Sequence, residues 1–139
     1  MVYVIAQFSL LAVIAWPITN LHFSIIGLLL IFIAIVVAVW TLMTNKPGNF
    51  NIRPIPKITG ELITHGIYRY IRHPMYSSLF FAGLGIIFCM PIWWKLVAWL
   101  LLVVTLIFKA RFEERALVKH YVGYQAYQKN NKAFIPFIW

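Results

Sequence analysis

The chain has 139 residues, of which 63% are hydrophobic and only 11% are charged. A soluble domain usually carries about 25% charged residues, so this composition argues against an ordinary soluble protein and indicates a single membrane-embedded domain. The net charge of +9 does not indicate a nucleic-acid partner. All but one of the 12 basic residues lie in two clusters, 46–72 and 109–132, which flank apolar runs as in the cytoplasmic parts of membrane proteins.

Two apolar runs open the chain, at residues 2–18 and 23–43, and a short polar turn joins them. A helix needs about 20 apolar residues to cross a bilayer, so these runs predict a hairpin of two membrane helices over residues 1–43. No basic stretch precedes the first run and no small-residue cleavage site follows it. We therefore expect a retained helix rather than a cleaved signal peptide.

Prolines, glycines and basic residues follow the second apolar run. They predict a structured loop over residues 44–73, because proline fixes φ and prevents a long helix. Pro74 then opens a third helix, predicted over residues 74–90, since proline is favoured in the first turn. A fourth helix is predicted over residues 93–108, with a polar continuation along the membrane face to about residue 127.

These elements predict an all-α membrane protein with about four transmembrane helices, a structured cytoplasmic loop and a C-terminal interfacial helix. The chain is expected to form one domain over residues 1–139, with its core helices and tail at 74–139. The basic residues place the loop and both termini on the cytoplasmic side, and the turns at 19–22 and 90–95 outside. The single cysteine, Cys89, excludes an internal disulfide and a cysteine-based zinc site, and no metal site is predicted.

The first group of residues that could carry chemistry is Arg72-His73, directly before the third helix. The free N–H groups and positive dipole end of a helix favour an anion. Together with a guanidinium and an imidazole they suit a carboxylate or a phosphate. The simpler interpretation is that Arg72 contacts lipid headgroups and that His73 caps the helix.

The second group is Glu113-Glu114, two of the three acidic residues in the chain. Lys109 and Arg111 stand at helical spacing from them, so local ion pairs on the helix surface are one interpretation. Adjacent helical residues differ by about 100° in direction, so at least one carboxylate should point into the bundle or along the membrane face. Its partner would be the Arg72-His73 corner, or a ligand with a cationic centre or a ribose diol.

Both groups belong to longer sequence patterns. Residues 62–76 match Leu-x-x-x-Gly-x-Tyr-x-x-x-Arg-His-Pro-x-Tyr at every anchor. Glu113-Glu114-Arg-Ala-Leu117 is followed by three tyrosines and a closing Ile-Pro. At these residues the sequence resembles the isoprenylcysteine carboxyl methyltransferase family and the related phospholipid N-methyltransferases. It departs from that pattern at Ser78, where the family usually has glycine, and around residues 121–124, where one segment is a residue short. The tyrosines are Tyr121, Tyr124 and Tyr127, and their helical spacing alone would indicate an interfacial stripe.

The resemblance implies a membrane methyltransferase with S-adenosylmethionine as its cofactor, in a pocket at the cytoplasmic face. That cofactor carries a carboxylate, an amine, a ribose diol and a sulfonium. The resemblance implies that Arg72, His73 and the helix that Pro74 opens bind the carboxylate side of the cofactor. It implies that the two glutamates bind the ribose hydroxyls or the amine. The aromatic ring that faces the sulfonium would be Tyr68 or Tyr76.

The methyl acceptor implied by the resemblance is lipidic or a small hydrophobic molecule, such as a prenylcysteine-like carboxylate, reached from the lipid bilayer. Methyl transfer is an in-line displacement, so catalysis would rest on placement and on water exclusion. Arg111 or Lys109 would orient an anionic acceptor. The catalytic residues expected on this view are Arg72, Arg111 and Glu114, with Tyr68, Arg72, His73, Pro74, Tyr76, Glu113 and Glu114 binding the cofactor.

Two other functions fit parts of the pattern. A sterol-reductase type of membrane enzyme has a similar Arg-His-x-x-Tyr segment and uses NADPH, but adjacent carboxylates would repel its 2′-phosphate. A four-helix transporter or assembly protein would commonly place an acid at mid-membrane. No acidic residue lies inside any apolar run, which disfavours that second alternative.

Overall fold

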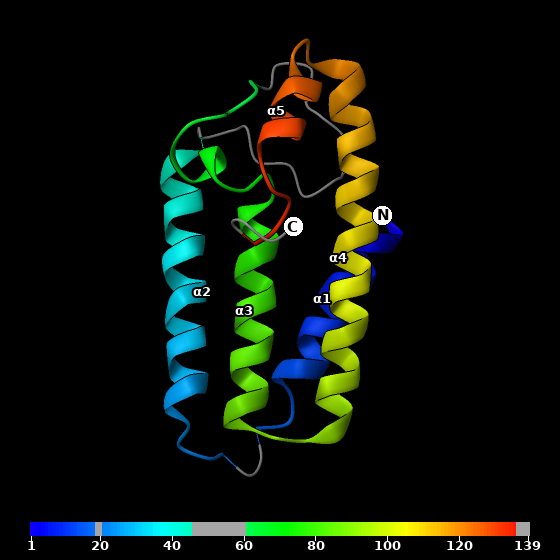
Figure 1. The fold of residues 1–139 in the computed structure, drawn as a ribbon. Helices are drawn as coiled ribbons and strands as arrows, with labels where there is room; N and C mark the ends of the chain where they lie inside the picture. Colours follow the sequence, from blue (N-terminus) through cyan, green and yellow to red (C-terminus); the bar gives the residue numbers. More distant parts are fainter. Residues whose placement is uncertain (19–20, 46–60, 136–139) are drawn as a thin grey trace.

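The structure is a computed structural model, and it describes residues 1–18, 21–45 and 61–135 (Figure 1). Within these ranges the chain is helical, and its one β-type contact is an isolated bridge between Ile71 and Lys132. This confirms the predicted all-α class. The elements are α1 (Val2–Ala15), α2 (Ile25–Thr44), the short 3-10 helix η1 (Gly66–Arg69), α3 (Pro74–Cys89), α4 (Trp93–His120) and α5 (Tyr124–Asn130).

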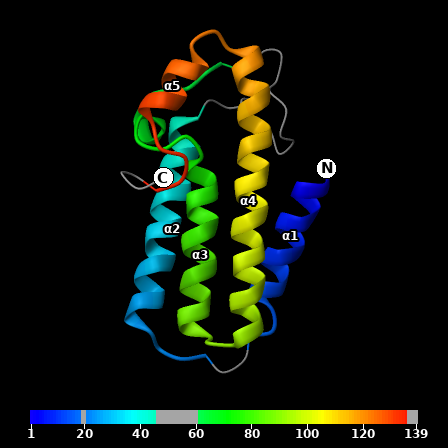
Figure 2. The same cartoon turned by 45° about the vertical axis from the view of Figure 1, so that its right-hand side comes forward.

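The four long helices form a bundle in which α3 is central. It packs along α2 on one side and contacts α4 and α1 on the other, while α1 packs mainly on α4 (Figures 1 and 2). α4 has 28 residues and is the longest helix. Its polar end, η1 and α5 gather at one end of the bundle (Figure 1). The predicted site residues are therefore brought to a single end of the molecule.

The apolar surface of the bundle agrees with a membrane protein. Large apolar side chains of α1 and α2 point outward, among them Phe8, Leu29 and Phe32. Among the described residues, one helix, α2, is both long and apolar enough to cross a membrane; α1 and α3 are apolar but shorter. The prediction of four transmembrane helices is thus supported for one helix, and the all-helical fold is supported for the whole described chain.

Helix ends differ from the predictions where proline and glycine lie. α1 ends at Ala15, three residues earlier than predicted, because the residue before Pro17 takes an extended conformation. The predicted polar continuation of the fourth helix beyond residue 108 is confirmed, but its predicted end at about residue 127 is wrong. α4 ends at His120, and Gly123, with a left-handed φ of 92°, turns the chain into the separate helix α5. Residues 46–60 of the predicted loop lie outside the described residues.

The described part of the loop rests on the end of α2 at Gly66. This glycine has a φ of +57°, and a Cβ there would lie 2.6 Å from Cγ2 and 2.7 Å from Oγ1 of Thr44. A side chain would therefore be strained by the backbone and would also displace Thr44. Gly66 lets η1 lie against α2 directly before the Arg72-His73 segment.

We expect Gly66→Ala to lower the thermal stability of the protein in detergent more than Gly123→Ala does. Both glycines have positive φ, so each variant should lose about 1–2 kcal/mol through backbone strain. A Cβ on Gly123 would have no atom within 4 Å, whereas a Cβ on Gly66 would meet Thr44. Equal losses in the two variants would show that the contact with Thr44 does not hold the loop.

Candidate active site

The Arg72-His73 segment is fixed by a second segment from the far end of the chain. The Arg72 N–H donates to the Lys132 carbonyl at 2.8 Å, and the His73 N–H donates to the Ala133 carbonyl at 3.0 Å. These bonds flank the parallel bridge between Ile71 and Lys132. The start of α3 and the tail that follows α5 therefore lie side by side, although the tail carries no motif that predicted this pairing.

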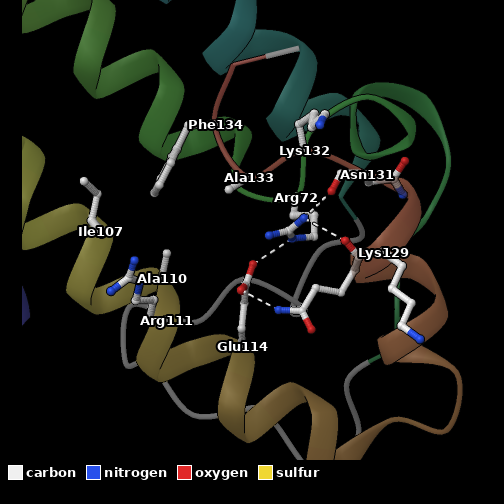
Figure 3. A pocket seen from close by; sticks show the side chains of 11 residues that line it. Arg72, Ile107, Ala110, Arg111, Glu114, Lys129, Asn131, Lys132, Ala133 and Phe134 are labelled. Carbon is white, nitrogen blue, oxygen red and sulfur yellow. Dashed lines mark hydrogen bonds and ion pairs between the residues drawn. The ribbon is translucent and has the colours of Figure 1, made fainter. Parts of the chain in front are cut away.

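The guanidinium of Arg72 joins three parts of the chain (Figure 3). Its Nε donates to Oε1 of Glu114 at 2.7 Å, which links it to α4. Its Nη1 donates to the carbonyl of Gln128 in α5 at 3.0 Å and also to the carbonyl of Asn131. The side chain is only 11% exposed. Arg72 thus faces the protein interior, and the interpretation as a lipid-headgroup contact is wrong.

His73 lies between the two glutamates. Its Nε2 is 3.0 Å from Oε1 of Glu114, and its Nδ1 is 3.7 Å from Oε2 of Glu113. The ring stacks on Tyr76 with an interplanar angle of 3° and also packs near Phe134. His73 is the N-cap residue of α3, as predicted, but its side chain makes no capping hydrogen bond and serves the glutamates instead.

The two carboxylates lie in the polar extension of α4, beyond its apolar part, and their environments differ. Glu113 accepts a 2.5 Å hydrogen bond from the Tyr76 hydroxyl. Burial raises the pKa of Glu113, and His73, Tyr76 and Lys109 oppose that shift only in part. Burial acts on Glu114 as well, but hydrogen bonds from His73 and Arg72 outweigh it and lower its pKa to about 2.

The structure therefore confirms that the Glu113-Glu114 pair meets the Arg72-His73 corner. It also excludes the alternative of local ion pairs on the helix surface for the described residues, since Lys109 and Arg111 form none with these glutamates. Lys109 is buried and donates to Gln7 of α1 instead. Arg111 is exposed at the edge of the pocket described next.

A pocket of about 340 Å³ opens beside Arg72 and Glu114 (Figure 3). This volume lies within the range of small-molecule sites. Gln128 donates to Oε2 of Glu114 at 2.7 Å and forms part of the wall. The other lining residues are Ile107, Ala110, Arg111, Lys129, Asn131, Lys132, Ala133 and Phe134. The lining thus combines basic side chains with apolar ones.

The remaining predicted residues lie behind this pocket or beside it. His73, Tyr76 and Glu113 form a second layer in contact with Glu114 or with one another, and none of them lines the pocket. Pro74 is buried at the start of α3. Ser78 is buried and donates to the Met75 carbonyl at 2.7 Å, so it serves the helix and does not line the pocket either.

The tyrosines do not form the predicted interfacial stripe. Tyr124 is buried, and the hydroxyl of Tyr127 donates to the carbonyl of Tyr68 at 2.6 Å. Burial raises the pKa of Tyr68 to about 12, and it raises the pKa values of Tyr124 and Tyr127 above their usual range. All three hydroxyls therefore stay protonated at neutral pH, and the hydroxyl of Tyr127 connects α5 to η1.

The comparison with known proteins now adds a family to this geometry. The profile of a family described as phospholipid methyltransferase matches residues 22–123. The chain belongs to the phospholipid methyltransferase family. Membership confirms the resemblance seen in the sequence and indicates a membrane-associated methyltransferase that acts on a lipid-type substrate. No curated protein matches the chain.

The matched region of the phospholipid methyltransferase family contains Arg72, His73 and both glutamates, but neither α1 nor α5. Several contributions to the site come from outside it: Gln128, Lys129, the tail at 131–134, and Gln7. Gln128 and the tail bind Arg72 and His73 through backbone carbonyls, which every residue possesses, so the local sequence carries no signal for these contacts.

Proposed function

We propose that this protein transfers a methyl group from S-adenosylmethionine to a lipidic acceptor at the cytoplasmic face of a membrane. The observation that carries the proposal is the meeting of Arg72 and His73 with Glu114, 42 and 41 residues away in sequence, beside a pocket of about 340 Å³. Family membership supports the reaction class, and the chemistry of the pocket supports the cofactor.

The residues present suit the polar groups of that cofactor. Glu114 keeps its negative charge at all ordinary pH values and faces the pocket, so it can accept hydrogen bonds from an amine or from ribose hydroxyls. No described residue accepts a hydrogen bond from Nη2 of Arg72, which leaves that nitrogen for a ligand carboxylate. When bound, S-adenosylmethionine supplies an activated methyl group on a sulfonium.

The second layer has a positioning role in this proposal. His73 holds Glu114 from behind, and Tyr76 holds Glu113, so the direct contact of the cofactor is with Glu114 rather than with both acids. Tyr68 lies with η1 at the same end of the bundle, and its assignment to the sulfonium stays a proposal. Catalysis would come from holding the acceptor and the methyl group at attack distance in a site closed to water.

The acceptor side of the pocket combines charge with apolar surface. Arg111, Lys129 and Lys132 line it and have no carboxylate partner among the described residues. Ile107 and Phe134 line it from the side of the bundle. We therefore propose an acceptor with an anionic group and a hydrocarbon part that enters from the bilayer between helices, with Arg111 orienting the anion. A prenylcysteine-like carboxylate and a phospholipid headgroup both have this chemistry.

The proposed topology is multi-pass, with both termini and the site on the cytoplasmic side. Two observations support it. The basic residues from 111 to 132 lie in the polar end of α4, in α5 or in the tail, at the end of the bundle that carries the site, as the positive-inside rule requires for a cytoplasmic face. The outward-facing apolar side chains of α1 and α2 would contact lipid over the rest of the bundle.

The test is calorimetry on the purified chain in detergent with S-adenosylmethionine, its demethylated product and NADPH. We expect both sulfur compounds to bind and Glu114→Gln to weaken that binding at least tenfold, since one charged hydrogen bond contributes about 1.5–3 kcal/mol. NADPH is included because the two acids are already paired and the free cations of the pocket could hold its phosphates. Tight NADPH binding without either sulfur compound would overturn the proposal.

The acceptor can be found by incubating the protein with cofactor and a total membrane lipid extract. The expected result is a lipid class that gains the mass of one methylene group with the wild-type protein and not with Glu114→Gln. Matching losses of cofactor binding and of lipid modification would place both events at the same pocket.

A further inference from the structure

A buried lysine near the acidic pair lies outside the pocket lining. Lys109 stands one helical turn before Glu113 on α4, and it is only 4% exposed. Its Nζ donates to Oε1 of Gln7 in α1 at 2.8 Å. Holding a charged ammonium inside an apolar bundle is costly, so such residues commonly have a role beyond packing. The described pocket does not include Lys109.

The ammonium of Lys109 also faces the aromatic ring that serves Glu113. Its Nζ lies 4.9 Å from the centre of the Tyr76 ring, close enough for a cation–π contact. The hydroxyl of the same tyrosine donates to Glu113 at 2.5 Å. A continuous set of contacts thus runs from α1 through Lys109 and Tyr76 to the acidic pair.

The charges around Glu113 come from every element that packs near it. Lys109 and Glu114 share its helix, Tyr76 belongs to α3, His73 precedes α3, and Tyr124 belongs to α5. α1 contributes the uncharged Gln7 through Lys109. Burial and Glu114 oppose the ionised form of Glu113, whereas His73, Tyr76 and Lys109 favour it. Of the three groups that favour the ionised form, His73 also contacts Glu114 and Tyr76 also contacts Phe134, which both line the pocket. Among the described residues, Lys109 makes no such contact with the pocket lining.

We propose that Lys109, anchored by Gln7 and facing the Tyr76 ring, is a positioning residue whose charge favours the ionised form of Glu113 and its bond to Tyr76. This role rests on the proposed function, because Glu113, Tyr76 and His73 form the layer that supports the cofactor site. It also assigns a role to α1, which lies outside the region matched by the family. A lysine that only joined α1 to α4 would affect stability and leave the ionisation of Glu113 unchanged.

The composition of the chain allows a direct measurement. Its three acidic residues are all glutamates, Glu61, Glu113 and Glu114. The full chain, labelled with ¹³C at the glutamate carboxyl carbon and held in detergent, should therefore give three side-chain carboxyl signals by NMR. Glu→Gln variants at positions 113 and 114 assign them, and a pH titration then gives the midpoint of Glu113 without any cofactor.

We expect Lys109→Gln to raise the Glu113 midpoint by about one pH unit, because a nearby opposite charge shifts a carboxyl by about 1–3 units. Lys109→Met should act in the same direction and serves if the glutamine variant does not fold. Lys109→Arg keeps the charge and should restore a midpoint close to that of the wild type. The matched control is Lys95→Gln, since Lys95 is fully buried at the other end of α4 and bonds to the Pro17 carbonyl.

An unchanged Glu113 midpoint in both neutral variants would overturn the proposal. An equal shift in Lys95→Gln would overturn it too, because the shift would then follow from a loosened bundle. The titration needs no S-adenosylmethionine, so its outcome is separate from that of the calorimetric test of function. If the protein binds no cofactor but shows the shift, the role of Lys109 stands and the proposed reaction is contradicted.

Discussion

Replacing Arg72 with methionine is expected to destabilise the protein by about 3–5 kcal/mol, the usual cost of removing one partner from a buried ion pair. The variant leaves Glu114 with His73 and Gln128 as its remaining partners. It also removes the donor to the carbonyls of Gln128 and Asn131. The effect should therefore extend beyond α4 to α5 and the tail.

Two measurements check this result in detergent: thermal unfolding, and limited trypsin digestion, which should cut first after Lys129 and Lys132 in the variant. Arg72→Lys should recover little, because an ammonium cannot reproduce the planar fork that reaches three acceptors. Arg111→Met is the control, since Arg111 lines the same pocket but is exposed and has no ion-pair partner among the described residues. Unchanged digestion of the Arg72 variant would show that the tail is held by other contacts.

Acid should also remove stability, and the relevant group is Glu114. Its pKa falls from an ordinary 4.5 to about 2 in the folded protein. A lowered carboxyl pKa stabilises the folded state above pH 4.5, and this contribution is lost as the pH falls from there to about 2. The difference corresponds to at most about 3 kcal/mol, which screening by solvent at the pocket reduces. We expect the unfolding temperature of the wild type to drop across this window.

Glu114→Gln should lower the unfolding temperature at neutral pH and flatten its decline in acid, because the titrating group is gone. Glu113→Gln should keep the acid decline. Glu113 has a raised pKa, so its contribution is present below pH 4.5 and is lost as the pH rises through its folded value. A wild-type decline that persists unchanged in Glu114→Gln would assign the acid sensitivity to another group.

Much of the fold follows from one-dimensional patterns. The apolar runs predict the helices to within a few residues, and the errors occur at Pro17 and Gly123, where one residue changes the direction of the backbone. The convergence of the basic corner with the acidic pair was also predictable. Carboxylates at the end of an apolar run need partners, and the chain offers few cations that precede a helix.

The rest of the site depends on contacts that leave no local pattern. The tail pairs with Arg72 and His73 through backbone groups, which are the same in any sequence. Lys109 stands at the end of an apolar run, where a cation is usually interfacial. Its burial follows only from the packing of α1, whose Gln7 lies 102 residues earlier in the sequence. The roles of the site residues toward a cofactor remain predictions for the binding experiments.

The pairing of the tail with the start of α3 has a consequence for the order in which the site forms during synthesis. The ribosome makes residues 128–134 after all four long helices, so the helix bundle can form before Arg72 meets its carbonyl partners. A chain stopped at residue 123 would contain the whole region matched by the family and still lack one wall of the pocket. Formation of the helix bundle and assembly of the site are therefore separate events, and the segment after α5 completes the site.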